Sequence, residues 1–457
     1  MVYIFPSLFV IQKDGDGKTK IESDDIITPF NTVIQTSLYC YDGDYSKEQI
    51  SQLEEEYEEK ICYYHALSDR HYYYTYEGNQ INNIKVINDS YGTEKPVTLV
   101  PYLYNLLKKS YEFTINSEGR FNIFLGKLND VYENKIDEVH SLSCSSSYDQ
   151  ELMDVTGLYF ASFDERQIEE IASYTQALPT IEEMKQILTF DDGTYSVTFH
   201  SLKDNNGLNR PIEISLGGSA KGYMTEYYAN EIQKEYPGIC LIMNSGTSSI
   251  KATNLRVDGK PFKVRYINPS YQEQVDAIKS SYNDYEVSLT LDGPFSISTS
   301  GNYEKYFFEY DNGNFVRRSH ILNSETGYSQ NSFDQVSVIM DDAFMADMYT
   351  TALMNTFSID DAKRLLSNLN DSYGLEAKAI ITKKMYQDHD YEMNINHYSP
   401  LDENHFIIKE NGQYKTKLID SFKEVYYVDE SLSSSFSLIE KSKLKNSQNV
   451  VSEIKTL

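Results

Sequence analysis

The stretch SISTSGNYEKY at residues 296–306, with the sequence that follows it as far as Met354, contains three small polar clusters. The clusters are Thr299-Ser300-Gly301, HILNSETGY at 320–328 and ADMYTTAL at 346–353. The third predicts a helix, because Asp342 is a suitable N-cap and neither glycine nor proline interrupts the cluster. Asp347 and Thr351 are four residues apart, so we expect them to share one face of that helix.

A carboxylate and a hydroxyl on one helical face suit a magnesium ion, which prefers hard oxygen ligands. The alternative is an ordinary helix, with Asp347 near its start and Thr351 as a buried structural residue. Taken alone, this spacing favours the ordinary helix, since short motifs match by chance.

An upstream segment, SLGGSAKGY at 215–223, predicts a strand that ends in a glycine turn and is followed by a helix. Gly217 and Gly218 would let backbone N–H groups approach a phosphate, and the N-terminus of the next helix favours negative charge. Lys221 adds a mobile cation to the same turn. The segment therefore predicts an anion-binding turn.

In this order, the four clusters resemble the ApbE family of flavin transferases, which move FMN from FAD to a protein hydroxyl. The family pattern is D-L-G-G-x-A-K-G, T-S-G-x-Y-E, H-x-x-x-P-x-T-G and A-D-x-x-x-T-A. The resemblance covers residues 27–385, most of the chain. It implies an α+β fold in which two T-fold-like halves enclose a flavin cleft.

The resemblance also implies roles for individual residues. Mg²⁺ would be held by Asp347, Thr351 and the backbone carbonyl of Ala220, and Lys221, Asp347 and His320 would take part in catalysis. His320 would act as a base or stabilise charge; the alternative is a histidine held by a structural hydrogen bond. The residues implied for FAD binding are Asn31, Thr32, Tyr74, Gly217, Gly218, Ser219, Ala220, Lys221, Thr299, Ser300, Gly301, His320, Thr326 and Gly327.

Four positions depart from the family pattern. Ser215 stands where the pattern has Asp, and Asn323, Ser324 and Glu325 stand where it has Asp-Pro-Arg. Glu325 would place an acid beside a phosphate site, which is unfavourable unless its side chain points to solvent. Because both side-chain metal ligands are retained, we expect an active enzyme.

The composition limits the kinds of partner. The chain has 457 residues, with 41 Lys and Arg against 69 Asp and Glu and a net charge of −28. Such an acidic chain is a poor match for nucleic acid or an anionic membrane surface, both of which attract basic patches. No run of apolar residues is long enough to span a membrane. The expected partners are FAD and an acceptor flavoprotein that presents a Thr or Ser hydroxyl.

We expect an N-terminal lead segment at 1–26, the ApbE-like domain at 27–390, and a small appended module with a frayed tail at 391–457. Residues 119–126 should be a turn leading into a strand, and residues 129–180 an irregular surface insertion.

The first twelve residues are apolar, but they lack the basic start and the lipobox cysteine of a lipid-anchored leader. Members of the resembled family are often exported and lipid-anchored, so the compartment is left open between an exported and a cytoplasmic location.

Three other functions stay open from the sequence. The chain could be a FAD pyrophosphatase that releases FMN and AMP, or a non-catalytic flavin-binding or interaction protein. The third is an α+β protein whose motif matches are coincidental.

Overall fold

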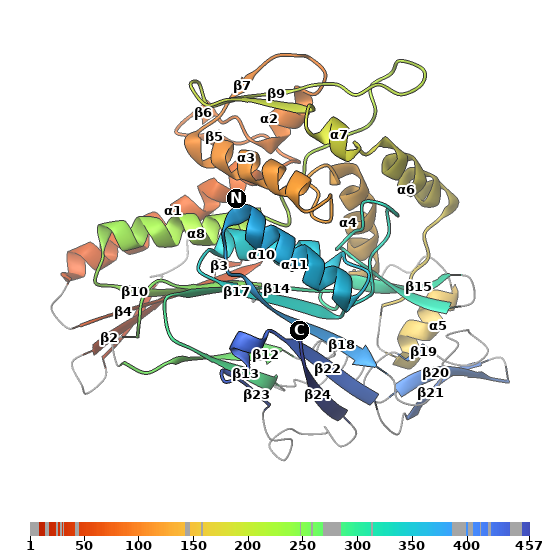
Figure 1. The fold of residues 1–457 in the computed structure, drawn as a ribbon. Helices are drawn as coiled ribbons and strands as arrows, with labels where there is room; N and C mark the ends of the chain where they lie inside the picture. The colour runs from red at the N-terminus through yellow and green to blue at the C-terminus, as the bar shows by residue number, and fades with distance from the viewer. Residues whose placement is uncertain are drawn as a thin grey trace.

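The computed structural model describes most of the chain. The described residues are 9–13, 18–23, 26–27, 30, 32–41, 45–141, 147–156, 159–246, 248–256, 259–267, 285–311, 314–385, 399–400, 405–411, 413–418, 422–438 and 450–457. They form an α+β fold, in which helices lie above one large sheet and a smaller sheet lies below it (Figure 1). The predicted fold class is confirmed.

The large sheet has eleven strands and crosses the middle of the molecule (Figure 1). They are β1 (Phe9–Lys13), β2 (Lys18–Ser23), β3 (Ile26–Ile27), β4 (Val33–Tyr41), β10 (Cys240–Ser245), β11 (Ser249–Ala252), β14 (Phe295–Gly301), β17 (Gln335–Met340), β18 (Lys378–Met385), β22 (Phe422–Val428) and β24 (Val450–Thr456). Their order is β1-β2-β4-β10-β11-β14-β17-β18-β22-β24, with β3 paired to β4. Distant parts of the chain therefore meet in one sheet.

Strand β17 is buried along its whole length because both faces of the sheet are covered. Its sequence alternates between two cores: Val336 and Val338 belong to the core beneath the helices, and Ile339 belongs to the core on the opposite face. The period of two along a strand explains this division.

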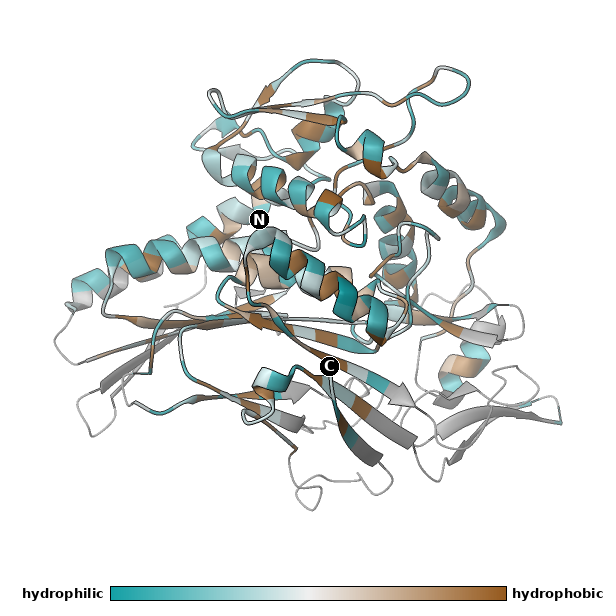
Figure 2. Cartoon of the chain, in the orientation of Figure 1, coloured by the Kyte–Doolittle hydropathy of each residue, from teal (hydrophilic) through white to brown (hydrophobic). Residues whose placement is uncertain are grey.

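Ten helices are described. They are α1 (Lys47–Ser68), α2 (Ile84–Asp89), α3 (Pro101–Asn116), α4 (Gly126–His140), α5 (Ser147–Thr156), α6 (Glu165–Ala177), α7 (Ile181–Met184), α8 (Ala220–Glu235), α10 (Ala343–Met354) and α11 (Ile359–Tyr373). Helix α10 is buried on nearly every side between the sheet and the other helices. Figure 2 shows the mixture of hydrophilic and hydrophobic positions on the outer helices.

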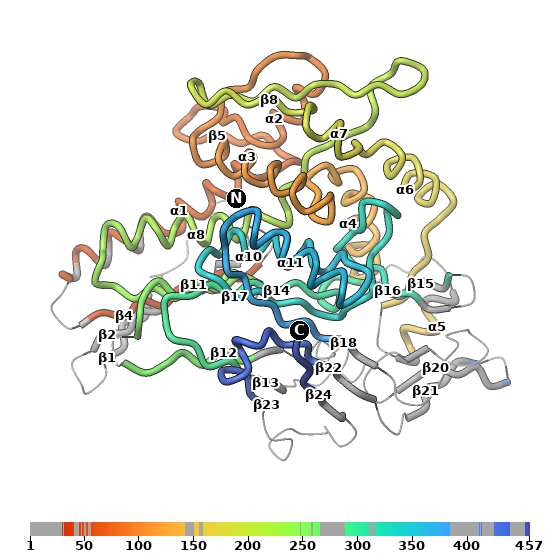
Figure 3. Tube along the Cα trace, in the orientation of Figure 1, coloured from red at the N-terminus to blue at the C-terminus, as the bar shows by residue number. Residues whose placement is uncertain are grey.

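Helices from the two halves of the chain pack together above the sheet. Phe113 on α3 lies with its ring centroid 5.4 Å from that of Tyr349 on α10 and 5.8 Å from that of Tyr373 on α11. Figure 3 shows the same proximity along the trace. This packing sets the position of α10, which carries two of the predicted site residues.

Below the large sheet lies a three-stranded sheet of β12 (Phe262–Ile267), β13 (Tyr285–Leu291) and β23 (Phe436–Leu438). Phe262, Leu289 and Phe436 of this sheet pack against Phe295 and Ile297 of β14. Four further groups of strands are small. They are β5 (Thr75–Tyr76) with β6 (Asn79–Gln80); β7 (Val97–Thr98) with β8 (Leu188–Asp191) and β9 (Ser196–Phe199); β15 (Tyr306–Asp311) with β16 (Asn314–Ser319); and β19 (Ser399–Pro400) with β20 (His405–Glu410) and β21 (Gln413–Leu418).

Two predictions for residues 119–180 were wrong. Residues 121–125 form a turn that leads directly into α4 instead of a strand, and the region that follows contains α4, α5 and α6. The apolar side chains of Leu128, Val131 and Ile136 recur at helical spacing and are buried in a third core. This spacing is visible in the sequence, and burial of these three side chains stabilises a helix despite the polar residues between them.

The C-terminal extension is built into the fold. β22 pairs antiparallel with β18, β24 pairs parallel with β22, and β23 pairs with β13. The prediction of a frayed tail was therefore wrong for residues 450–457, because the sheet supplies hydrogen-bond partners for their backbone. The proposed domain boundaries at 26 and 390 stay predictions. None of the described helices is long and apolar enough to span a membrane.

Candidate functional site

A cavity of about 840 Å³ opens where β10, β11 and β14 meet the glycine turn, α10 and the loops around residues 120 and 305. Its volume lies within the range of roughly 300–1,000 Å³ that is typical of small-molecule and cofactor sites. Six Lys and Arg side chains and four Asp and Glu side chains are among the described residues that line it, although the chain as a whole carries a net charge of −28. The fold thus concentrates positive charge in a strongly acidic protein.

The glycine turn and the start of α8 form one wall of the cavity. Gly217, Gly218, Ala220 and Lys221 all line it. A Cβ atom on Gly218 would lie 3.2 Å from the ring of Phe121, so the missing side chain leaves the backbone close to the cavity. Because the positive end of the helix dipole also points here, the wall can bind an anion.

Asp347 lies deep in the site, with 5% of its surface exposed. One carboxylate oxygen accepts a hydrogen bond from the Gly222 N–H at 3.0 Å, and the other accepts one from Ser298 Oγ at 3.1 Å. Desolvation raises the pKa of Asp347, while Lys221 and these two donors oppose the rise. A buried carboxylate of this kind would be stabilised by a bound cation.

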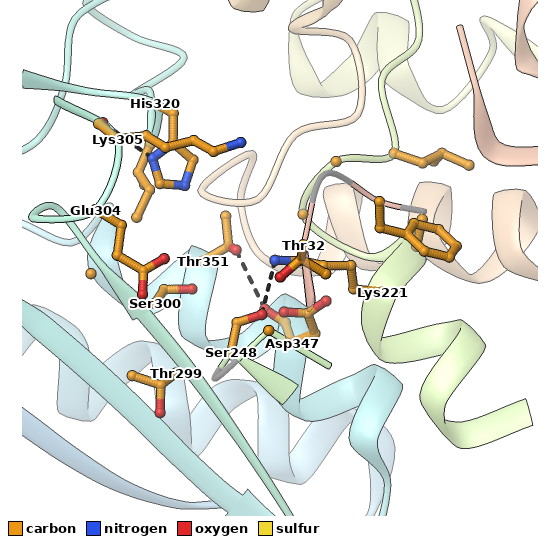
Figure 4. Close-up of a pocket in the computed structure, with 18 of the residues that line it drawn as sticks. Thr32, Lys221, Ser248, Thr299, Ser300, Glu304, Lys305, His320, Asp347 and Thr351 are labelled. Carbon is orange, nitrogen blue, oxygen red and sulfur yellow. Dashed lines mark hydrogen bonds between the residues drawn. The ribbon is translucent and has the colours of Figure 1, made fainter. Parts of the chain in front are cut away.

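Thr351 lies one helical turn after Asp347, as its spacing predicts. Its Oγ1 is 3.4 Å from the Asp347 backbone carbonyl, to which it donates (Figure 4). N-capping by Asp342 explains where this helix begins, because the Asp342 carboxylate accepts from the N–H groups of Phe344 and Met345 at 2.9 and 3.0 Å. The local sequence therefore aligns the two oxygen-bearing side chains.

Lys221 reaches across the cavity from the first turn of α8. Its Nζ donates to Ser248 Oγ at 2.8 Å (Figure 4). Ser248 in turn is fixed to β14, because its carbonyl accepts from the Thr299 N–H at 2.7 Å and from Ser298 Oγ at 2.8 Å. The ammonium group is thereby held near Asp347, where its charge opposes the rise in the pKa of that carboxyl group.

His320 lies beside Lys305 on the opposite wall (Figure 4). Its Nδ1 is 3.4 Å from the Lys305 carbonyl oxygen. A carbonyl oxygen can only accept a hydrogen bond, so Nδ1 carries the proton and Nε2 is left as an acceptor. Desolvation by the cavity walls, together with the charges of Lys305 and Lys221, lowers the pKa of His320 to about 4. His320 also borders open space inside the cavity. The lowered pKa leaves its imidazole neutral at pH 7.

The end of α1 supplies a part of the lining that the sequence interpretation missed. His65 Nδ1 accepts from the Phe30 N–H at 3.1 Å, which joins the helix to the segment before β4. Buried Arg70 lies 2.7 Å from Asp130, 2.9 Å from Glu133 and 2.9 Å from Glu213. The one signal in the sequence was the spacing of His65 and Asp69, which are one helical turn apart and therefore predicted to lie on the same side of the helix end.

His71, Asp130 and Glu133 also lie close enough to hold a metal ion, with ligand atoms within 4.8 Å of one another. The two carboxylates already share the Arg70 guanidinium. We therefore interpret this group as a salt-bridge network.

Eleven predicted site residues line the cavity. They are Thr32, Gly217, Gly218, Ala220, Lys221, Thr299, Ser300, Gly301, His320, Asp347 and Thr351. The structure thus brings the four sequence clusters together in one place.

Four predicted residues lie elsewhere, and Asn31 is outside the described residues. The Tyr74 hydroxyl donates to Asp69 at 2.9 Å and does not line the cavity. Ser219 faces α3, where its Oγ accepts from Ser110 Oγ at 3.0 Å. Thr326 and Gly327 form a turn in which Thr326 Oγ1 accepts from the Tyr328 N–H at 3.2 Å.

Comparison with known proteins agrees with this architecture. The model of the ApbE family matches residues 71–375. Similar solved structures include the ApbE protein of Thermotoga maritima (19% identity, 82% of this chain and 94% of that chain, TM-score 0.55) and flavin transferase ApbE of Vibrio cholerae (14%, 88% and 96%, 0.52). Another is flavinyl transferase ApbE of Pseudomonas stutzeri in its apo form (14%, 90% and 95%, 0.51).

At these identities the structural likeness establishes the fold alone. No curated protein sequence matches the chain. The family model nevertheless covers more than half of the 457 residues. The chain belongs to the ApbE family.

Proposed function

We propose that the chain is a magnesium-dependent FAD:protein FMN transferase, which moves FMN from FAD to a Thr or Ser hydroxyl of an acceptor flavoprotein and releases AMP. The observation that carries this proposal is the meeting of the glycine turn, Lys221, His320, Asp347 and Thr351 in one cavity. Membership of the ApbE family supports flavin transfer as the reaction class.

The residues present suit a magnesium ion. Asp347 is the buried one among the four carboxylates that line the cavity, and desolvation raises its pKa. With Thr351 and the Ala220 carbonyl it would provide an all-oxygen ligand set. When bound, magnesium would neutralise charge on the diphosphate and on the departing AMP.

The chain's own groups would bind and orient the diphosphate. Backbone N–H groups at Gly217 and Gly218, the N-terminus of α8 and the Lys221 ammonium group all favour an anion in this part of the cavity. Phosphoryl transfer depends chiefly on positioning and charge stabilisation, which such a wall supplies.

His320 is the proposed base. The acceptor hydroxyl oxygen forms a bond to the phosphorus of the FMN half, and the phosphoanhydride bond to AMP breaks. The hydroxyl proton passes to Nε2 of His320, which is unprotonated because desolvation and the neighbouring lysines lower the pKa of this residue.

The proposal can be tested with purified protein, FAD and MgCl₂, with or without an apo acceptor domain that carries its flavin on a Thr hydroxyl. We expect the acceptor mass to rise by that of an FMN phosphoester, with one AMP released for each modified acceptor and no reaction in EDTA. An acceptor with that Thr changed to Ala is the control. Stoichiometric FMN release without acceptor would indicate a pyrophosphatase instead, and FAD binding without either reaction would indicate a binding protein.

A further inference from the structure

Arg120 is a basic residue of the cavity for which the proposed chemistry has no role. It lies in the turn between α3 and α4 and lines the cavity, with 11% of its side chain exposed. Its Nη1 is 3.2 Å from a carboxylate oxygen of Glu325. Glu325 is the acidic residue whose position beside a phosphate site is unfavourable on sequence grounds.

The guanidinium of Arg120 is held in place from several sides. Its Cζ lies 4.3 Å from the centroid of the Phe357 ring, and its Nη1 donates to the Asn355 carbonyl at 3.4 Å. Asp361 is 3.9 Å from Nη2. The position of this cation thus depends on more than its contact with Glu325.

This wall adjoins the end of the cavity where the diphosphate is proposed to bind. The Asn355 side-chain amide donates to the backbone carbonyls of Arg120 at 3.0 Å and Thr351 at 3.3 Å. The Phe121 ring packs against Gly218. A single side chain therefore separates the Arg120 backbone from the proposed metal ligand Thr351.

The same wall contains buried polar atoms without hydrogen-bond partners. They are Arg120 Nε, Asn122 Nδ2 and Asn355 Oδ1, and the two asparagines are 8% and 2% exposed. Buried polar atoms are nearly always paired in native proteins, by water or a ligand where protein groups are absent, and all three residues line the cavity.

We propose that Arg120 is a specificity-determining residue that binds the FAD diphosphate, and that Glu325 is its counterion in the absence of ligand. This inference rests on the proposed function. The Glu325 side chain is 60% exposed, and giving up an exposed ion pair costs little. A guanidinium binds phosphate through two parallel hydrogen bonds, which favours the exchange of Glu325 for the diphosphate as the partner of Arg120.

The exchange predicts effects of opposite sign for two residues that form one ion pair. Arg120→Ala removes a charge-assisted contact and should weaken FAD binding at least tenfold. Glu325→Gln removes a competing negative charge and should strengthen FAD binding about two- to fivefold. A salt bridge with only a structural role would instead make both changes weaken binding.

Calorimetric titration of each purified variant with FAD and with riboflavin, at one salt concentration with Mg²⁺ present, tests this inference. Riboflavin lacks phosphate, so its affinity should be unchanged in both variants, and Arg120→Lys should bind FAD with intermediate affinity. The matched control is Arg210→Ala, since Arg210 pairs with Glu183 at 2.9 Å and also has an unpartnered Nε, but does not line the cavity. It should leave FAD affinity unchanged.

Each outcome distinguishes the two proposals. If the wild-type protein binds FAD and Arg120→Ala binds it equally well, or if Glu325→Gln also weakens binding, the role of Arg120 is wrong while the proposed function stands. The same holds if riboflavin binding falls in parallel with FAD binding. If the wild-type protein does not bind FAD, both proposals fail.

Discussion

The Asp347 carboxylate accepts a hydrogen bond from the backbone N–H of Gly222 at 3.0 Å, which ties the interior of α10 to the first turn of α8. A Cβ atom on Gly222 would lie 2.5 Å from Asp347 Cβ and 2.7 Å from the Ala343 carbonyl oxygen. Only glycine permits this close approach, so one small residue holds the proposed metal ligand beside the glycine turn.

Gly222→Ala should therefore force α8 and α10 apart. We expect the free energy of unfolding to fall by about 1–3 kcal/mol, because overpacking a close helix contact strains both elements. FAD affinity should fall as well. Urea unfolding and FAD titration measure the two effects. Gly193→Ala is the control, since its added Cβ would meet only the end of the Asp191 side chain at 3.2 Å. Equal unfolding midpoints for the two variants would contradict the packing argument.

Asp347→Asn should abolish the effect of magnesium without unfolding the protein. We expect the transfer rate to fall at least a hundredfold, on the order expected when a group that stabilises transition-state charge is lost. In thermal denaturation, FAD in MgCl₂ should stabilise the wild-type protein by about 2.7 kcal/mol at a hundredfold excess over Kd, and it should stabilise the protein less in EDTA. The variant should show no difference between the two buffers. A magnesium-dependent shift that survives in the variant would place the metal elsewhere.

The pH dependence of transfer should reflect the unprotonated His320. Its pKa is lowered from 6.5 to about 4, so the base stays active as the pH falls below 6. We expect kcat/KM, which reports the free enzyme, to stay level from pH 8 to about pH 5.5 and to decline only at lower pH. His320→Gln should reduce the rate about 10²- to 10⁴-fold and remove this acid limb. A wild-type limb centred at or above pH 6.5 would show that the pKa of His320 is not lowered, and a limb that persists in His320→Gln would argue against His320 as the base.

Asp342→Asn should change the pH dependence of stability. Desolvation, followed by the charge of Glu226, raises the pKa of Asp342 above 3.8. The ionised form is thus disfavoured in the folded protein, and wild-type stability falls as pH rises from about 3.8 through the folded-state pKa.

Asparagine keeps the N-cap without the charge, so the Asp342→Asn variant should be at least as stable as wild type at pH 7. The advantage should shrink as pH falls toward 4. Urea unfolding at pH 7 and pH 5 measures the difference. A variant whose deficit is greatest at pH 7 would show that the ionised carboxylate stabilises the fold.

Several local features could be predicted from neighbouring residues alone. Helix α8 occupies Ala220–Glu235 as expected, and Asp342 caps α10. Thr180 and Glu183, three residues apart, form a capping box at the start of α7. Each depends on residues within one helical turn, so the information needed is contained in a short segment of sequence.

The charged walls of the cavity could not be predicted in this way. Arg70 is paired with Asp130, Glu133 and Glu213, which follow it by 60 to 143 positions. Nothing in the sequence near Arg70 indicates which carboxylates will neutralise it. Side-chain partners at such separations are set by the packing of whole helices.

The sequence by itself determined the order of the four polar clusters, the glycine turn before α8 and the shared face of Asp347 and Thr351, because these follow from backbone geometry over a few residues. Only the tertiary structure decided that Ser219 faces α3, that Arg120 meets Glu325, and that β22 extends the sheet. The physical reason is that a side chain's direction and partner depend on how distant strands and helices pack, and spacing along the chain does not specify those distances.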